Sequence, residues 1–251
     1  MIPKKIHYFW FGENKKSDLV MKCINSWKKY CPDYEIIEWN ESNYDVHKNE
    51  YMEQAYLAKR WGFVSDYARL DIIYNYGGIY LDTDVEIIRP FDIGFEKKQV
   101  SSNSFFVNTG QGFGAEALNP GIKKMLDVYD NIFFFKDGRE NLKTCPYYNT
   151  EALVGLGMKQ ENVYQNIRGI ISIYPSEYFC PINWKNQKCE ITKNTYSIHH
   201  FNASWLSKEE KRKRKIQRKI DYIIHIPNLI LLSIFGKKRY ETIKRKIRRK
   251  N

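Results

Sequence analysis

The 251-residue sequence predicts an α/β fold in which helices flank a mostly parallel sheet. Short apolar stretches, rich in β-branched and aromatic residues, alternate with stretches of helical periodicity in the first part of the chain. Such alternation is typical of strand–helix–strand units, which place successive strands in parallel. Hydrophobic residues make up 43% of the sequence and aromatic residues 16%, so the chain can bury a sizeable core.

The elements of the first half follow from apolar spacing and from the residues that end each stretch. Ser17 is a helix-capping residue type, and the apolar stripe after it ends before Pro32. Gly77 and Gly78 stand where a helix commonly ends. We therefore predict a strand over 2–11, a helix over 17–30, a strand over 34–39, a helix over roughly 50–60, a helix over 64–76 and a strand that carries Asp82 and Asp84.

The second half of the sequence is less regular. Apolar spacing predicts helices over 120–129 and 150–156 and a strand over 170–174. Residues 176–198 read as loop and strand, and they lead to a pair of histidines, His199 and His200.

The formal net charge of +12 is concentrated at the C-terminus. Residues 207–251 hold 17 Lys and Arg against 4 Asp and Glu, a net of +13, which leaves 1–206 with a net of −1. We therefore predict a globular α/β domain over 1–206 and a basic, amphipathic helical tail over 207–251.

The tail has three interpretations. Its two basic runs, 208–219 and 237–250, flank the apolar segment 222–235. A disordered charged end and nucleic-acid binding are two of the interpretations. Attachment to an anionic membrane surface fits the apolar segment better, while Pro227 and the short length argue against a spanning helix. We favour membrane attachment and do not expect nucleic acid to be the partner.

Cysteine usage and the N-terminal residues bear on the cellular compartment. The five cysteines form no CxxC pair, which argues against a disulfide framework and against a zinc–thiolate site. Residues 1–6 lack the apolar stretch of a signal peptide. Together with the tail, these features predict a cytoplasmic protein held peripherally at the inner face of the plasma membrane.

Asp82 and Asp84 form the sequence's strongest candidate for a metal site. If both lie on a strand, their side chains share one face, because side chains two residues apart point the same way. Paired carboxylates suit Mn²⁺ or Mg²⁺. An acidic solvent face is the competing interpretation, and an EF-hand loop is excluded because Ile87 stands where glycine is required.

A phosphatase of the haloacid-dehalogenase type is another interpretation of the same pair. Asp82 would then be the nucleophile and Asp84 the general acid. That family usually opens with this strand and carries a later pair of aspartates, and neither feature occurs in this sequence.

Asp66 and Arg69 lie three residues apart on the helix that precedes the acidic pair. A surface ion pair would account for them and would contribute only a few tenths of a kcal/mol. Alternatively, the guanidinium fork of Arg69 suits phosphate or sugar oxygens, and Asp66 can accept hydroxyl hydrogens. Their nearness to Asp82 in the chain favours the functional interpretation.

Aromatic and imidazole side chains gather at two further places. Residues 7–11 hold a histidine and aromatic side chains that are either core or a platform for stacking a base. His199 and His200 invite a ligand role, because imidazole can complete a mixed oxygen and nitrogen site for Mn²⁺.

Taken together, these segments resemble the DxD-containing sugar transferases of glycosyltransferase family 32, which includes capsular polysaccharide synthesis proteins. Initiating mannosyltransferases and clostridial glucosylating toxin domains are related members. The resemblance is carried by residues 2–10, 65–69, 76–84, 174–179 and 199–205. It implies a GT-A fold, a nucleotide-sugar donor, Mn²⁺ or Mg²⁺ as cofactor, and transfer with retention of anomeric configuration.

By position, the resemblance also implies roles for single residues. Tyr8, Phe9 and Trp10 would lie near the base of the donor, and Asp66 and Arg69 near its sugar and phosphates. The remaining implied donor-binding residues are Tyr80, Asp82, Ser204 and Trp205, and the implied catalytic residues are Asp66, Arg69, Asp82 and Trp205.

The implied metal site contains Asp82 and Asp84, with His200 as the preferred third ligand and His199 as the second choice. The function that follows is transfer of a hexose, from a donor that we expect to be UDP-linked, to a glycan or lipid-linked acceptor in surface polysaccharide synthesis. The rival functions are phosphatase chemistry at Asp82 and a non-enzymatic basic protein that binds membrane or nucleic acid through its tail.

Overall fold

The structure is a computed structural model that describes residues 1–91, 99–103, 106–182 and 188–202, together with residues 209, 212, 213 and 216. Residues Met1–Ile182 and Cys189–Trp205 cluster as one compact unit. Ser204, Trp205 and nearly all of the tail lie outside the described residues, so their implied roles and the domain boundary at 206 stay predictions. Among the described residues, no helix combines the length and apolar character needed to cross a bilayer.

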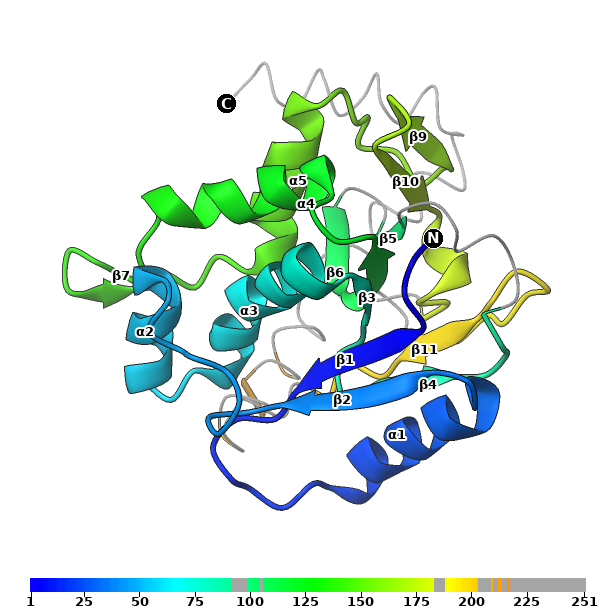
Figure 1. Ribbon diagram of the computed structural model, residues 1–251, viewed down its shortest axis with the longest axis horizontal. Coiled ribbons are helices and arrows are strands. Elements are labelled where there is room, and N and C mark those ends of the chain that lie inside the picture. The colour runs from blue at the N-terminus through cyan, green and yellow to red at the C-terminus, as the bar shows by residue number, and fades with distance from the viewer. Residues whose placement is uncertain are drawn as a thin grey trace. The chain divides into compact units, whose positions relative to one another are not determined.

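A seven-stranded sheet in the order β2-β1-β3-β6-β5-β10-β9 forms the centre of the described structure (Figure 1). Its strands are β1 (Lys5–Phe9), β2 (Glu35–Trp39), β3 (Gly78–Tyr80), β5 (Gln99–Asn103), β6 (Phe106–Ala115), β9 (Gln165–Ile167) and β10 (Ile171–Tyr174). β1 pairs in parallel with β2 and β3, and β5 pairs in parallel with β10. β6 runs antiparallel between β3 and β5, and β9 is antiparallel to β10. Five of the seven strands therefore run in one direction, with β6 and β9 opposed to them, and the predicted α/β fold with a mostly parallel sheet is confirmed.

The helices also largely follow the sequence prediction. They are α1 (Asp18–Tyr30), α2 (Glu50–Leu57), α3 (Trp61–Tyr76), α4 (Pro120–Leu126) and α5 (Cys145–Gly155), with 3-10 turns over Asp127–Asn131 and Ser176–Tyr178. Ser17 is the N-cap of α1, as predicted. Four boundaries differ from the predictions: α2 ends early, α4 ends at Leu126 where a 3-10 turn follows, and both α3 and α5 begin earlier than their apolar spacing indicates.

The sheet is buried on both faces, and β1 shows how. Ile6 and Tyr8 join the apolar cluster around α1, whereas Phe9 joins the cluster around α2, α3, α4 and α5. Figure 1 shows α1 and α3 on opposite sides of β1. Because successive side chains of a strand point to opposite faces, β1 must be apolar on both.

The prediction that Asp82 and Asp84 lie on a strand is wrong. β3 ends at Tyr80 and β4 (Val85–Ile87) begins after Asp84, so both aspartates lie in the turn between these strands. The backbone N–H of Val85 donates to the carbonyl of Asp82 at 3.0 Å and closes this turn. β4 then leaves the main sheet and pairs antiparallel with β11 (Ser197–His199), which brings the distant histidine to the aspartates.

Candidate functional site

The middle of α3 supplies two charged residues that are buried. The side chains of Asp66 and Arg69 are 7% and 4% exposed, so they do not form the surface ion pair considered from the sequence. Residues 63–73 of this helix are all buried, because apolar clusters and the turn after β3 surround it. Burying two charges is unfavourable unless each is paired and hydrogen-bonded.

Arg69 meets that requirement through contacts on every side of its guanidinium group. Its Nε donates to the carbonyl of Ser65 at 2.7 Å, and its Nη2 donates to the Ser65 hydroxyl at 2.8 Å and to Asp66 Oδ1 at 3.0 Å. Its Nη1 lies 3.2 Å from Asp82 Oδ1, and the group stacks 4.9 Å above the Tyr80 ring. Arg69 therefore joins α3 to the turn that carries Asp82.

Asp66 is held from the other side by the start of α5. Its Oδ2 accepts a hydrogen bond from the backbone N–H of Cys145 at 3.1 Å. Burial raises the pKa of Asp66 to about 6, although Arg69 and the Cys145 hydrogen bond oppose this shift. Contact of Asp66 or Arg69 with a donor stays a prediction; the geometry shows that Asp66 holds Arg69, which in turn contacts Asp82.

Asp82 is further positioned by Tyr80 and Gly110. The Tyr80 hydroxyl donates to Asp82 Oδ1 at 2.9 Å, and the backbone N–H of Asp82 donates to the carbonyl of Gly110 at 3.2 Å. A Cβ atom added to Gly110 would lie 2.2 Å from Asp82 Oδ2. Because Gly110 has no side chain, this position of β6 leaves room for the Asp82 carboxylate.

Asp84 and His199 face one another across the β4–β11 pair. His199 Nε2 lies 3.0 Å from Asp84 Oδ1 and 3.9 Å from Asp82 Oδ2. The other oxygen of Asp84 accepts from the backbone N–H of Asn202 at 2.7 Å. Burial opposes the charge on Asp84, but the charge of His199 and these hydrogen bonds outweigh it and lower the pKa of Asp84. In turn Asp84 raises the pKa of His199 against the effect of burial.

His200, the preferred ligand from the sequence, lies elsewhere. Its Nε2 is 2.9 Å from Glu86 Oε2, which also accepts from Lys22 Nζ at 2.7 Å. Neighbouring residues of an extended chain point to opposite sides, so His199 and His200 cannot both face the aspartates. The structure thus brings His199 to Asp82 and Asp84 and pairs His200 with Glu86.

The donor atoms of Asp82, Asp84 and His199 form a group that fits a divalent metal ion. One ligand atom from each residue lies within 4.8 Å of the others. The Nδ1 of His199 is buried without a hydrogen-bond partner in the described structure, while its Nε2 points at the carboxylates. The two carboxylates suit either Mn²⁺ or Mg²⁺, and the imidazole favours Mn²⁺, because Mg²⁺ takes nitrogen ligands less readily.

The aromatic segment at the end of β1 divides between core and pocket. Tyr8 and Phe9 are buried, and the Tyr8 hydroxyl donates to Glu38. Trp10 is half-buried, donates from Nε1 to the carbonyl of Asn14 at 2.6 Å, and lies under Lys16. Of the three predicted base-binding residues, Trp10 is therefore the one that is not fully buried.

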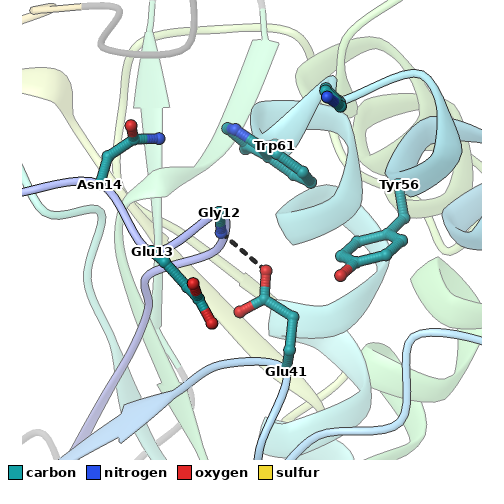
Figure 2. Close-up of a pocket in the computed structure, with 7 residues that line it drawn as sticks. Gly12, Glu13, Asn14, Glu41, Tyr56 and Trp61 are labelled. Atoms are coloured by element: carbon teal, nitrogen blue, oxygen red, sulfur yellow. Dashed lines mark hydrogen bonds between the residues drawn. The ribbon is translucent and has the colours of Figure 1, made fainter.

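A pocket of about 520 Å³ opens beyond the carboxyl ends of β1 and β2 (Figure 2). Figure 2 shows the Trp61 indole, Tyr56 and Glu41 around it, with Gly12 donating its N–H to Glu41 Oε1 at 2.7 Å. Ligands of α/β sheets commonly bind beyond such strand ends. The residues that line the pocket are Gly12, Glu13, Asn14, Glu41, Tyr56, Lys59 and Trp61.

Comparison with known sequences shows which protein family the segment around Asp82 and Asp84 is similar to. Residues 17–104 match the family described as "Glycosyltransferase sugar-binding region containing DXD motif". This part of the chain is similar to the sugar-binding region of DXD glycosyltransferases, and we call residues 17–104 the DXD region. The DXD region contains Asp66, Arg69 and the turn from Asp82 to Asp84, so the resemblance to DxD sugar transferases is confirmed.

Two curated proteins of Schizosaccharomyces pombe align with the chain. Inositol phosphoceramide mannosyltransferase 3 is 33% identical over 103 residues, which are 36% of this chain and 26% of that protein. Inositol phosphoceramide mannosyltransferase 1 is 30% identical over 101 residues, which are 36% of this chain and 30% of that protein. The chain thus spans less than a third of the length of these relatives.

A solved structure, PaToxG Glycosyltransferase, shares the fold. It has a TM-score of 0.51 and 24% sequence identity, and the match covers 61% of this chain and 69% of that chain. At this identity the likeness speaks to the fold alone. The predicted GT-A type of α/β fold is confirmed.

Sequence reasoning missed three features of the site. It preferred His200 over His199, because only the pairing of β4 with β11 shows which histidine faces Asp84. It gave no role to Gly110, which makes room for Asp82, or to Cys145, whose N–H holds Asp66. All three depend on contacts between segments that lie far apart in the sequence, and no local pattern signals them.

Proposed function

We propose that this chain is a metal-dependent glycosyltransferase that moves a hexose from a nucleotide sugar to a glycan or lipid-linked acceptor, with retention of anomeric configuration. The observation that carries the proposal is the group of Asp82, Asp84 and His199, whose ligand atoms lie within 4.8 Å of one another inside the DXD region. These three residues would hold Mn²⁺ or Mg²⁺, with His199 replacing His200 as the imidazole ligand. When bound, such an ion neutralises negative charge on the oxygens of a diphosphate leaving group.

The chain's own residues would prepare this site before the donor binds. Arg69 and Tyr80 fix one oxygen of Asp82, and the N–H of Asn202 fixes one oxygen of Asp84. The carboxylates therefore need little rearrangement, which is how preorganised groups favour a charged transition state. In a retaining transfer the acceptor hydroxyl attacks on the side of the leaving group and its proton passes to the departing phosphate, so no protein base is required.

The donor and acceptor classes are narrower proposals. The resemblance favours UDP-linked hexoses as donors. The aligned Schizosaccharomyces pombe relatives are named mannosyltransferases, which supports GDP-mannose as the alternative donor. The same names contain a ceramide lipid, which supports a lipid-linked acceptor over a free glycan. We also propose that the basic tail over 207–251 holds the chain at an anionic membrane, where surface polysaccharide is assembled.

The direct test is donor hydrolysis. A panel of UDP-hexoses and GDP-mannose is incubated with the protein in Mn²⁺ or in a chelator, and release of nucleoside diphosphate is measured. We expect turnover with at least one donor in Mn²⁺ only, and Asp84→Asn to lower it on the order of a hundredfold. Asp33→Asn is the matched control, because Asp33 pairs with Lys4 on the surface at the amino end of β2.

Two rival functions give different results in the same preparation. A phosphatase that uses Asp82 would release phosphate from a generic aryl phosphate, and the proposed transferase would not. A basic binding protein would hydrolyse no donor at all. Turnover that survives both the chelator and Asp84→Asn would also contradict the proposal.

A further inference from the structure

A hairpin between the 3-10 turn Asp127–Asn131 and α5 exposes two phenylalanines on either side of a buried one. β7 (Phe135–Lys136) pairs with β8 (Arg139–Glu140), and Asp137 and Gly138 turn the chain with positive φ angles of 51° and 72°. Phe134 is fully buried, whereas Phe133 is 46% exposed and Phe135 is 43% exposed. We name residues 133–143 the aromatic-basic hairpin.

The aromatic-basic hairpin is anchored firmly to the rest of the compact unit. The Phe134 ring packs against Tyr51 and Phe63, with ring centroids 5.9 Å and 5.2 Å away. Glu140 accepts two hydrogen bonds from Arg60, at 3.0 Å from Nε and 2.8 Å from Nη2. The two exposed rings are therefore presented by a fixed support. Figure 1 shows β7 beside α2, where the N–H of Phe135 donates to Gln54 Oε1 at 2.9 Å.

Exposed basic residues accompany the two phenylalanines in the sequence of the hairpin. Lys136, Arg139 and Lys143 are all exposed, while the charge of Glu140 is already paired with Arg60. Only Asp137 adds an exposed acidic group in this segment. Exposed aromatic rings among lysine and arginine are typical of surfaces that dip into the headgroup region of an anionic bilayer. The long basic side chains can reach the lipid phosphates while the rings enter the acyl boundary.

We propose that the aromatic-basic hairpin docks on the surface of an anionic phospholipid bilayer, separately from the tail. The charge of the hairpin selects this occupant over a neutral apolar partner. The same segment leads through residues 141–144 to Cys145, whose N–H holds Asp66. Resting on the proposed function, this docking keeps the DXD region close to the bilayer that carries a lipid-linked acceptor.

The test places an environment-sensitive fluorophore on the hairpin of the full chain. In a Cys189→Ser background, Phe135→Cys is labelled, because the other four cysteines are buried. Val163→Cys, an exposed apolar residue outside the hairpin, is labelled as the control. Vesicles of phosphatidylcholine, alone or with an equal part of phosphatidylglycerol, are then added. We expect a blue-shifted, brighter emission from position 135 with anionic vesicles only, and no change from position 163.

A charge reversal tests the basic part of the hairpin. We expect Lys136→Glu with Arg139→Glu to weaken binding to anionic vesicles on the order of tenfold. Lys124→Glu with Lys159→Glu changes the net charge equally at exposed sites elsewhere and should weaken binding less. The proposal is overturned if the probe at 135 stays unchanged, whether or not the tail carries the chain onto the vesicles. It is also overturned by an equal response to zwitterionic vesicles or by equal losses in the two charge reversals.

Donor hydrolysis is measured on the same variants. Hydrolysis with an unresponsive hairpin probe rejects the docking alone, whereas absent hydrolysis with a responsive probe rejects the proposed transferase.

Discussion

Gly110 decides where the carboxylate of Asp82 can lie. Because an added Cβ would come within 2.2 Å of Asp82 Oδ2, Gly110→Ala must displace that side chain or the strand beneath it. We expect this variant to stay folded and to lose on the order of tenfold to a hundredfold in metal-supported donor hydrolysis. Hydrolysis rates at saturating and limiting Mn²⁺ measure the change.

A matched glycine makes this prediction decisive. A Cβ added to Gly155, at the end of α5, meets nothing within 4 Å. Gly155→Ala should therefore keep the wild-type rate. Equal rates for Gly110→Ala and wild type would show that the position of Asp82 does not matter to turnover.

His7 is a structural histidine, although the sequence grouped it with possible base-stacking residues. Its Nδ1 accepts from Trp39 Nε1 at 3.0 Å, so its protonated Nε2 donates to the carbonyl of Gly77 at 3.0 Å. Burial lowers the pKa of His7 to about 4, against the effect of the Gly77 hydrogen bond. The neutral ring thus supports the glycine turn that ends α3.

This shift predicts how stability depends on pH. The unfolded chain takes up a proton on His7 below about pH 6.5, while the folded chain resists it until about pH 4. The contribution of His7 is therefore complete above pH 6.5 and is lost as the pH falls toward 4, by about 3 kcal/mol. Urea unfolding at pH 7 and pH 4.5 should show a smaller loss for His7→Gln than for wild type. Parallel losses would contradict a neutral buried His7.

At the scale of elements, α4 is the described α-helix whose N-cap side chain accepts from two backbone N–H groups. Asn119 is 2% exposed, and its Oδ1 accepts from the N–H groups of Gly121 at 2.8 Å and Ile122 at 3.2 Å. We expect Asn119→Ala to lower the free energy of unfolding by about 1–2 kcal/mol, because two buried donors lose their partner. Urea unfolding measures it.

The N-cap of α1 provides the comparison. Ser17 is exposed, and its hydroxyl lies 3.4 Å from the N–H of Val20. Ser17→Ala should therefore cost less than Asn119→Ala. A larger loss at Ser17 would mean that burial does not set the strength of these caps.

Elements with strong local signals could be predicted, and those set by distant pairing could not. The Ser17 cap, the apolar stripe of α1 and the Gly77-Gly78 end of α3 are local, and the structure confirms them. The turn from Asp82 to Asp84 was predicted as strand because its flanks, β3 and β4, are apolar and β-branched. Whether such a run continues or turns depends on which strands pair with it, and here β4 pairs with β11.

At the scale of the whole molecule, the excess positive charge and the candidate metal site lie in different parts of the chain. Residues 1–206 carry a net charge of −1 and contain the DXD region, while the tail carries +13. Composition alone predicted this division, because it needs no knowledge of contacts. The sequence could predict four residues of the site, namely Asp66, Arg69, Asp82 and Asp84. It could not predict which histidine joins them, because β11 reaches the turn by pairing with β4, more than a hundred residues earlier in the chain.

The most direct test of the account is Mn²⁺ binding by the two neighbouring histidine variants. Free Mn²⁺ is followed by electron paramagnetic resonance during titration of the protein, with UDP or GDP present. We predict that His199→Ala weakens binding by about tenfold or more, because it removes the imidazole that faces Asp82 and Asp84. His200→Ala, which removes a contact with Glu86 and leaves the Lys22–Glu86 pair in place, should bind Mn²⁺ as the wild type does. Loss of binding in His200→Ala with retention in His199→Ala, or no binding by the wild type, would contradict the site proposed for this chain.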